Sequence, residues 1–125
     1  MTKLQTPFRY DFVGSFLRPQ ALKAAKAEYL AGKISEDAFN KVVEDEITKV
    51  VAKQKELGFH VITDGEFRRT FWHLDFMWGL EGVAHENTGG GVDFDGEFAL
   101  LDDTYLTGKI KAKPHPFVEY YRFLK

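Results

Sequence analysis

The chain has no cysteine among its 125 residues. Disulfides, thiol nucleophiles and thiolate metal ligands are therefore excluded within this sequence. The chain also lacks an apolar run of about 18 residues, which a membrane-spanning helix needs. Its first residues, MTKLQ, are not followed by the apolar core of a signal peptide. From these absences we expect a cytoplasmic protein that does not enter a membrane.

An excess of charge of one sign is missing as well. Lysine and arginine number 17 against 19 aspartates and glutamates, which gives a net charge of −2. This balance offers no basic footprint for nucleic acid or for an anionic membrane surface, so we expect neither as a partner. With 44% hydrophobic and 29% charged residues the composition is that of an ordinary globular protein, and the length suits one domain with a modest core.

Several common site signatures are absent too. The four histidines form no i, i+4 pair of the kind that binds zinc on a helix. The glycine-rich residues 88–91 (TGGG) lack the spacing of a dinucleotide or nucleotide phosphate loop, and there is no G-x-S-x-G nucleophile motif. The sequence by itself therefore predicts no metal site and no catalytic residue.

The most informative stretch is residues 61–76. Residues 61–63 are apolar β-formers and predict a buried strand that ends at the turn dipeptide Asp64-Gly65. Charged and aromatic side chains follow at once, namely Glu66, Arg68, Arg69, Trp72, His73 and Asp75. In α/β proteins ligands bind beyond the carboxyl ends of strands, so this placement suggests a site. The alternative is an ordinary turn followed by solvated ion pairs.

The preceding sequence predicts strand, helix, helix and strand. Residues 8–13 are the first candidate strand, and helical spacing of apolar residues predicts helices over 20–31 and over about 36–57. This βαβ order implies neighbouring parallel strands with a right-handed crossover. Ser15 then follows the first strand and Glu66 the second, so we expect the two side chains to face the same end of the sheet.

The remaining sequence is read as helix over 69–80, loop over 82–91, an edge strand or hairpin arm over 92–100, a strand over 105–110 and a final helix over 117–124. Three parallel strands cannot close a barrel of eight, which normally takes about 250 residues. We therefore interpret residues 1–125 as a single segment that opens a larger α/β domain and expect that domain to continue beyond residue 125.

Two motifs in this order carry a family resemblance: residues 13–19 (VGSFLRP), and residues 54–58 (QKELG) leading into residues 63–69 (TDGEFRR). The sequence resembles the cobalamin-independent methionine synthase family, and residues 72–76 (WHLDF) are typical of its short, single-barrel members. The resemblance covers almost the whole chain. It implies the N-terminal third of a (β/α)8 TIM-type barrel with parallel strands, in which a zinc ion activates homocysteine for methyl transfer from a folate.

The resemblance also implies roles for individual residues. Ser15 and Glu66 match residues that bind the amino-acid moiety of homocysteine, with Gly14 and Val13 supplying neighbouring backbone. Other members of the stretch line or brace the pocket, namely Arg68, Trp72, His73 and Asp75. The family's zinc ligands lie on later strands, so we expect no metal ligand and no catalytic residue here, and we predict that the 125-residue chain alone is inactive.

Two other functions stay open at this point. The protein could be a related zinc-dependent thiol alkyltransferase that uses a different thiol or donor. It could instead be a non-catalytic small protein that binds an amino acid or a partner chain. In the second case a partner or a homo-oligomer would have to cover the open strand edges, which otherwise invite aggregation.

Overall fold

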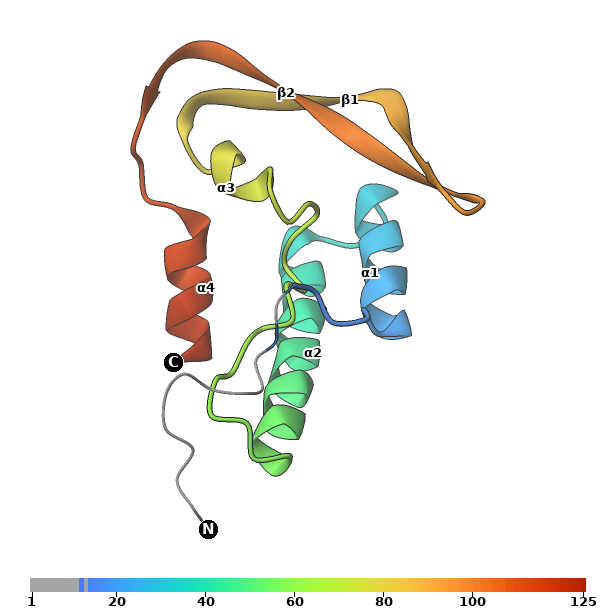
Figure 1. Cartoon of the computed structure of the whole chain (residues 1–125), viewed down its shortest axis with the longest axis vertical. Coiled ribbons are helices and arrows are strands. Elements are labelled where there is room, and N and C mark those ends of the chain that lie inside the picture. The colour runs from blue at the N-terminus through green and yellow to red at the C-terminus, as the bar shows by residue number, and fades with distance from the viewer. Residues whose placement is uncertain (1–11, 13) are drawn as a thin grey trace. The chain divides into compact units, whose positions relative to one another are not determined.

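The computed structural model describes residue 12 and residues 14–125, and the chain divides into two compact units, residues 1–69 and residues 70–125. The described part of the first unit contains helices α1 (Gln20–Leu30) and α2 (Glu36–Glu56). The second unit contains a short helix, a two-stranded sheet and a terminal helix: α3 (Asp75–Trp78), β1 (Glu81–Phe94), β2 (Glu97–Lys111) and α4 (Pro116–Leu124) (Figure 1).

The two predicted helices of the first unit are confirmed almost to the residue. Ser35 caps α2, since its hydroxyl accepts a hydrogen bond from the backbone N–H of Ala38 at 3.2 Å. Gly32 and Gly58, just past the two helices, have φ of 68° and 78°. These left-handed conformations are the ones that end helices and that glycine adopts without strain. Local signals in the sequence therefore set both helices.

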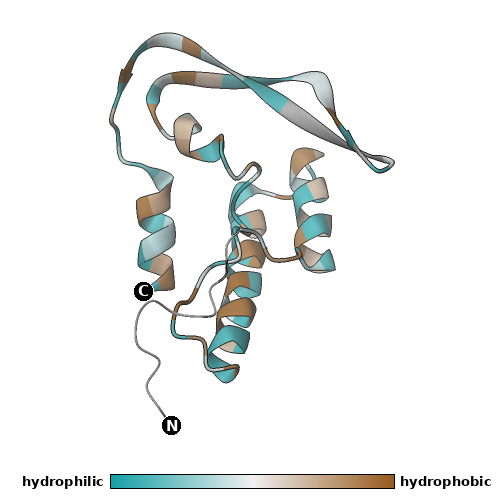
Figure 2. Cartoon of the chain, in the orientation of Figure 1, coloured by the Kyte–Doolittle hydropathy of each residue, from teal (hydrophilic) through white to brown (hydrophobic). Residues whose placement is uncertain are grey.

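The core of the first unit is the interface between these two helices. Leu22 and Ala25 on α1 and Val43 and Ile47 on α2 are buried, and Phe67 joins them from the segment that follows α2. The apolar residues are spaced along both helices among polar ones, as Figure 2 shows for α2. Each fully buried aliphatic side chain contributes about 1.5 to 3 kcal/mol, so this cluster fixes α1 on α2.

The predicted strand over residues 61–63 is wrong, since no described segment pairs with it as a strand. Instead the Gln54 side chain donates to the Thr63 carbonyl at 2.7 Å and accepts from the Thr63 N–H at 3.0 Å. One side-chain amide offers a partner for one residue, whereas a strand needs a continuous backbone ladder. The other predicted strand, residues 8–13, lies outside the described residues apart from Phe12, so that strand stays a prediction.

The predicted helix over residues 69–80 is also wrong in its extent, because only α3 forms. The Asp75 carboxylate accepts hydrogen bonds from the backbone N–H groups of Thr70 and Phe71, both at 2.8 Å. A side chain that binds backbone donors competes with helix formation. Asp75 thus holds the residues before it as a turn and begins the short helix itself.

The sheet of the second unit is an antiparallel hairpin, with Cα partners running from Glu81 and Lys111 to Phe94 and Glu97. Its turn is Asp95-Gly96, both with positive φ, the sequence and geometry preferred in tight hairpins. The strand over 105–110 is confirmed and the loop over 82–91 is wrong. Within the described residues the sheet is antiparallel and not the expected parallel one.

The C-terminal helix is confirmed as α4. His115 caps it, because its Nδ1 accepts from the N–H of Phe117 at 3.1 Å, and Pro116 occupies the first turn. The same imidazole contacts the carbonyl of Phe76 through Nε2 at 2.9 Å. His115 therefore connects the start of α4 to α3 within this unit.

Candidate functional site

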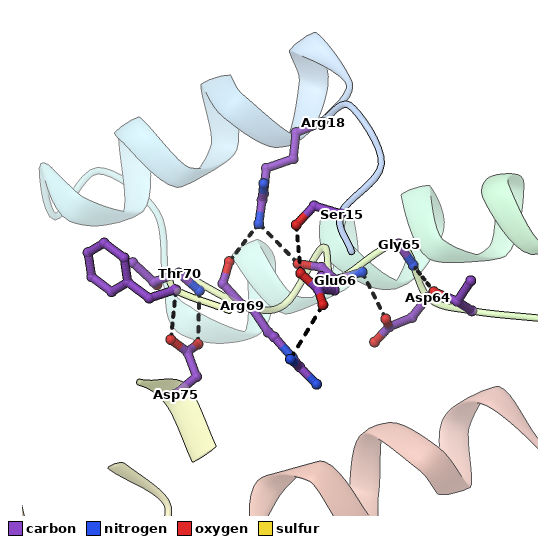
Figure 3. Close-up of polar contacts among 10 residues, drawn as sticks. Ser15, Arg18, Asp64, Gly65, Glu66, Arg69, Thr70 and Asp75 are labelled. Atoms are coloured by element: carbon purple, nitrogen blue, oxygen red, sulfur yellow. Dashed lines mark hydrogen bonds and ion pairs between the residues drawn. The ribbon is translucent and has the colours of Figure 1, made fainter. Parts of the chain in front are cut away.

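Ser15 and Glu66, which are 51 positions apart in the sequence, lie side by side (Figure 3). The Ser15 hydroxyl donates a hydrogen bond of 2.6 Å to Oε2 of Glu66. The Glu66 side chain is 17% exposed, so solvent and a small ligand can still reach it. The expected proximity of the two residues is confirmed, and their role in substrate binding stays a prediction.

The turn that carries Glu66 is unusual in its backbone. Gly65 and Glu66 both have positive φ, 67° and 59°. For a residue with a Cβ this left-handed conformation costs roughly 1 to 2 kcal/mol, and such residues cluster at functional sites. The turn is held by side chains two residues back: Thr63 Oγ1 accepts from the Gly65 N–H and Asp64 Oδ1 from the Glu66 N–H, both at 2.9 Å.

Three further hydrogen bonds connect the Ser15 segment to this turn. The backbone N–H of Phe16 donates to the Gly65 carbonyl at 3.1 Å. Arg18 donates from one nitrogen, Nη2, to the carbonyls of Glu66 at 3.1 Å and Arg69 at 2.9 Å. Sequence reasoning assigned Arg18 no role. The available signal was that a guanidinium lies three residues after Ser15 within the same motif.

Arg69 is the second cation beside Glu66. Its Nη1 lies 3.4 Å from Oε1, so one carboxylate oxygen of Glu66 faces a guanidinium and the other accepts the Ser15 hydroxyl. A carboxylate has about four lone-pair positions, so it can accept a further donor such as an ammonium group. Both carboxylate oxygens of Glu66 therefore have a polar partner among the described residues.

The other predicted pocket residues of this unit are Arg68, Gly14 and Val13. Arg68 has a side chain that is 10% exposed and lies 3.6 Å, through Nη2, from Oε1 of Glu44 on α2. It thus braces the turn against the helix. Gly14 has φ of 90°, a left-handed conformation that favours glycine. Val13 lies outside the described residues.

Trp72, His73 and Asp75 belong to the second unit. Trp72 is 74% exposed, and its ring contacts that of His73 with centroids 4.6 Å apart. The Asp75 carboxylate binds the two backbone N–H groups described above (Figure 3). Asp75 therefore has a local structural task, while pocket roles for Trp72 and His73 stay predictions.

The second unit contains a polar and aromatic cluster that the sequence did not reveal. The indole N–H of Trp78 donates to Thr104 Oγ1 at 2.9 Å, and its ring stacks on His85 with centroids 3.7 Å apart. His85 Nδ1 in turn contacts Oδ2 of Asp102 at 2.9 Å. These contacts fix α3 on the hairpin, and the sequence could not reveal them because the strand pairing was unknown.

No group of three or more metal-binding side chains gathers among the described residues in a way that could hold a metal ion. Together with the lack of cysteine, this donor set does not fit the zinc site that the resemblance implies. In the same described part of the chain, none of the helices is long and apolar enough to cross a membrane.

Comparisons with known proteins point in one direction. The family model described as "cobalamin-independent synthase, catalytic domain" matches residues 9–93, more than half of the chain. The uncharacterised protein YxjG of Bacillus subtilis is 39% identical over 124 residues, which are 99% of this chain and 33% of that protein. A Thermodesulfovibrio yellowstonii protein named 5-methyltetrahydropteroyltriglutamate–homocysteine methyltransferase is 36% identical over 90 residues, 71% of this chain and 12% of that protein.

A solved structure agrees with these sequence matches. It is a crystal structure of a Listeria monocytogenes protein proposed to be a vitamin-B12-independent methionine synthase. The two chains are 39% identical with a TM-score of 0.73, over 95% of this chain and 32% of that one. This chain therefore spans about a third of the length of YxjG and of the Listeria protein.

Proposed function

Because the chain belongs to the catalytic-domain family of the cobalamin-independent synthases, we propose that it forms part of a methyltransferase that converts homocysteine to methionine. In this proposal the chain supplies residues that bind the amino-acid end of homocysteine, and methyl-folate is the donor. The observation that carries it is the hydrogen bond between Ser15 and Glu66, which places a hydroxyl and a carboxylate together at a residue with a left-handed backbone.

The chemistry of this pair suits the amino-acid moiety of the substrate. The Glu66 carboxylate binds the α-ammonium group, an ion pair supported by charge-assisted hydrogen bonds and strengthened because Glu66 is largely buried. Ser15 keeps the carboxylate in orientation through Oε2 and contacts the amino-acid moiety through its hydroxyl and backbone. Gly14 supplies the neighbouring backbone, in a conformation with φ of 90° that favours glycine.

The rest of the catalytic centre is assigned to residues beyond this chain. Its described residues do not fit a zinc site, so ligands for the zinc ion would come from later parts of the (β/α)8 barrel that the family implies. We expect the 125-residue chain alone to bind substrate weakly and to transfer no methyl group. The cytoplasmic location, the homo-oligomer and the extension of the barrel beyond residue 125 stay predictions.

The test is calorimetric titration of the full-length protein with homocysteine, comparing wild type with Glu66→Gln. A hydrogen bond to a charged group contributes about 1.5 to 3 kcal/mol, so the loss of the charge should weaken binding roughly tenfold to hundredfold. Glu119→Gln is the matched control, because Glu119 is an exposed acid on α4 that pairs with Arg122. That control should bind as the wild type does.

Two outcomes would overturn the proposal. Equal affinity of the wild type and Glu66→Gln would remove Glu66 from the site. A wild-type protein that ignores homocysteine but binds another thiol would identify a related thiol alkyltransferase instead.

A further inference from the structure

Arg18 lies between the Ser15 segment and the turn that carries Glu66, half-buried just before α1. We propose that Arg18 is a positioning residue, which holds the Glu66 carboxylate in the orientation that binds the substrate's ammonium group. The inference rests on the proposed function, because it concerns the amino-acid-binding role of Glu66. Arg18 itself touches backbone carbonyls and not the Glu66 carboxylate.

The first argument is the geometry of the contact. One nitrogen of Arg18, Nη2, donates to the carbonyls of Glu66 and Arg69 at 3.1 and 2.9 Å, as the two dashed lines that meet at Arg18 in Figure 3 show. The Glu66 carbonyl also accepts from the N–H of Arg69 at 3.0 Å. A rotation of the peptide after Glu66 would break two hydrogen bonds at once, so this peptide is fixed.

The second argument is that Arg18 anchors both members of an ion pair. The carboxylate of Glu66 and the guanidinium of Arg69 face each other at 3.4 Å, and Arg18 binds the backbone carbonyl of each residue. The relative position of the two side chains is therefore set by a third residue. Arg69 in turn limits where the carboxylate can go, with Ser15 on the other oxygen at 2.6 Å.

The third argument is the backbone of Glu66. Its φ of 59° is left-handed, a conformation that a glutamate leaves readily unless its surroundings hold it there. Hydrogen bonds from a cation are roughly twice as strong as neutral ones, which suits Arg18 to this task. Without Arg18 the turn can relax toward negative φ, and the carboxylate then moves away from the Ser15 hydroxyl.

The experiment measures the dissociation constant of homocysteine for the full-length protein by calorimetry, in wild type, Arg18→Met and Arg18→Lys. We expect Arg18→Met to weaken binding about tenfold, since displacement of a binding group by a fraction of an ångström has effects of this order. Lysine should restore most of the affinity, because both bonds come from a single nitrogen that an ammonium can replace. Arg122→Met is the control, as Arg122 pairs with Glu119 on the same helix, α4.

A double-mutant comparison separates positioning from a general structural role. In the Glu66→Gln background, Arg18→Met should cause no further loss of affinity, because the group that Arg18 positions has already lost its charge. A loss of the same size in both backgrounds would overturn the proposal. So would an Arg18→Met protein that binds as tightly as wild type.

Two further outcomes keep the test decisive. If Arg18→Met does not fold, Arg18→Lys with a wild-type melting temperature replaces it. The role would be overturned if Arg18→Lys bound homocysteine as weakly as Glu66→Gln does. If the wild type does not bind homocysteine at all, the proposed function fails and the role of Arg18 fails with it. Wild-type binding with an unaffected Arg18→Met removes the role of Arg18 alone.

Discussion

Replacement of Gly65 by alanine tests how tightly the Glu66 turn is packed. Gly65 is buried with φ of 67°, and a Cβ on it would lie 3.0 Å from Cδ2 of Phe16 and 3.1 Å from Cε1 of Phe67. Gly32, between α1 and α2, has nearly the same φ of 68°, but a Cβ there would meet nothing within 4 Å. The two glycines thus share the backbone requirement and differ in the space around them.

The expected magnitudes follow from this difference. Alanine in a left-handed conformation costs roughly 1 to 2 kcal/mol, which should be the whole effect of Gly32→Ala. In Gly65→Ala the two aromatic rings must also shift, and overpacking of this kind costs about 1 to 3 kcal/mol more. We therefore expect a free energy of unfolding that is about 1 to 3 kcal/mol lower for Gly65→Ala than for Gly32→Ala.

The assay is urea denaturation of the full-length variants, followed by homocysteine titration. Gly65→Ala should also weaken homocysteine binding, because the Gly65 carbonyl accepts the Phe16 N–H and a shift there moves Glu66. Gly32→Ala should leave binding unchanged. Equal losses of stability in the two variants, within about 0.5 kcal/mol, would refute the reasoning, since the contacts with Phe16 and Phe67 would then be unimportant.

Two further predictions concern the buried side-chain amide of Gln54 and Gly79, a glycine with no room for a Cβ. Gln54 is 3% exposed and binds both backbone groups of Thr63, so Gln54→Leu should lower the unfolding free energy by about 2 to 4 kcal/mol in urea denaturation. Gln20→Leu at the exposed start of α1 should change it little, and equal effects would contradict the prediction. In Gly79→Ala a Cβ would lie 2.1 Å from Nε2 of His115, so the imidazole must leave the Phe76 carbonyl and thermal unfolding should reveal a loss of about 1 to 3 kcal/mol. Gly108→Ala, with nothing within 4 Å of its Cβ, is the control, and a matching loss there would count against the clash.

The hairpin shows where sequence reasoning failed and why. Residues 82–91 are polar and glycine-rich and read as loop, yet they form most of β1. Although its intrinsic strand propensity is low, β1 forms because β2 supplies its backbone hydrogen bonds. The residues of 82–91 alone do not reveal this partner. The turn dipeptide Asp95-Gly96 was a usable signal for a hairpin. Residues 61–63 failed in the opposite sense. They are β-formers, yet the backbone groups of Thr63 bond to the Gln54 side chain.

The family was readable from the sequence, because its motifs are short runs whose residues and order are specific. Both long helices were readable for a related reason: the cap at Ser35, the glycines after each helix and the apolar spacing act within a few residues. The expected proximity of Ser15 and Glu66 came from the predicted βαβ order, in which each residue follows one of two neighbouring strands. The pairing of the hairpin and the Trp78–His85 stack were decided only by the tertiary structure. So was the place of Arg18 between two carbonyls, since Arg18 lies 48 and 51 positions from Glu66 and Arg69 in the chain and no local pattern encodes such a contact.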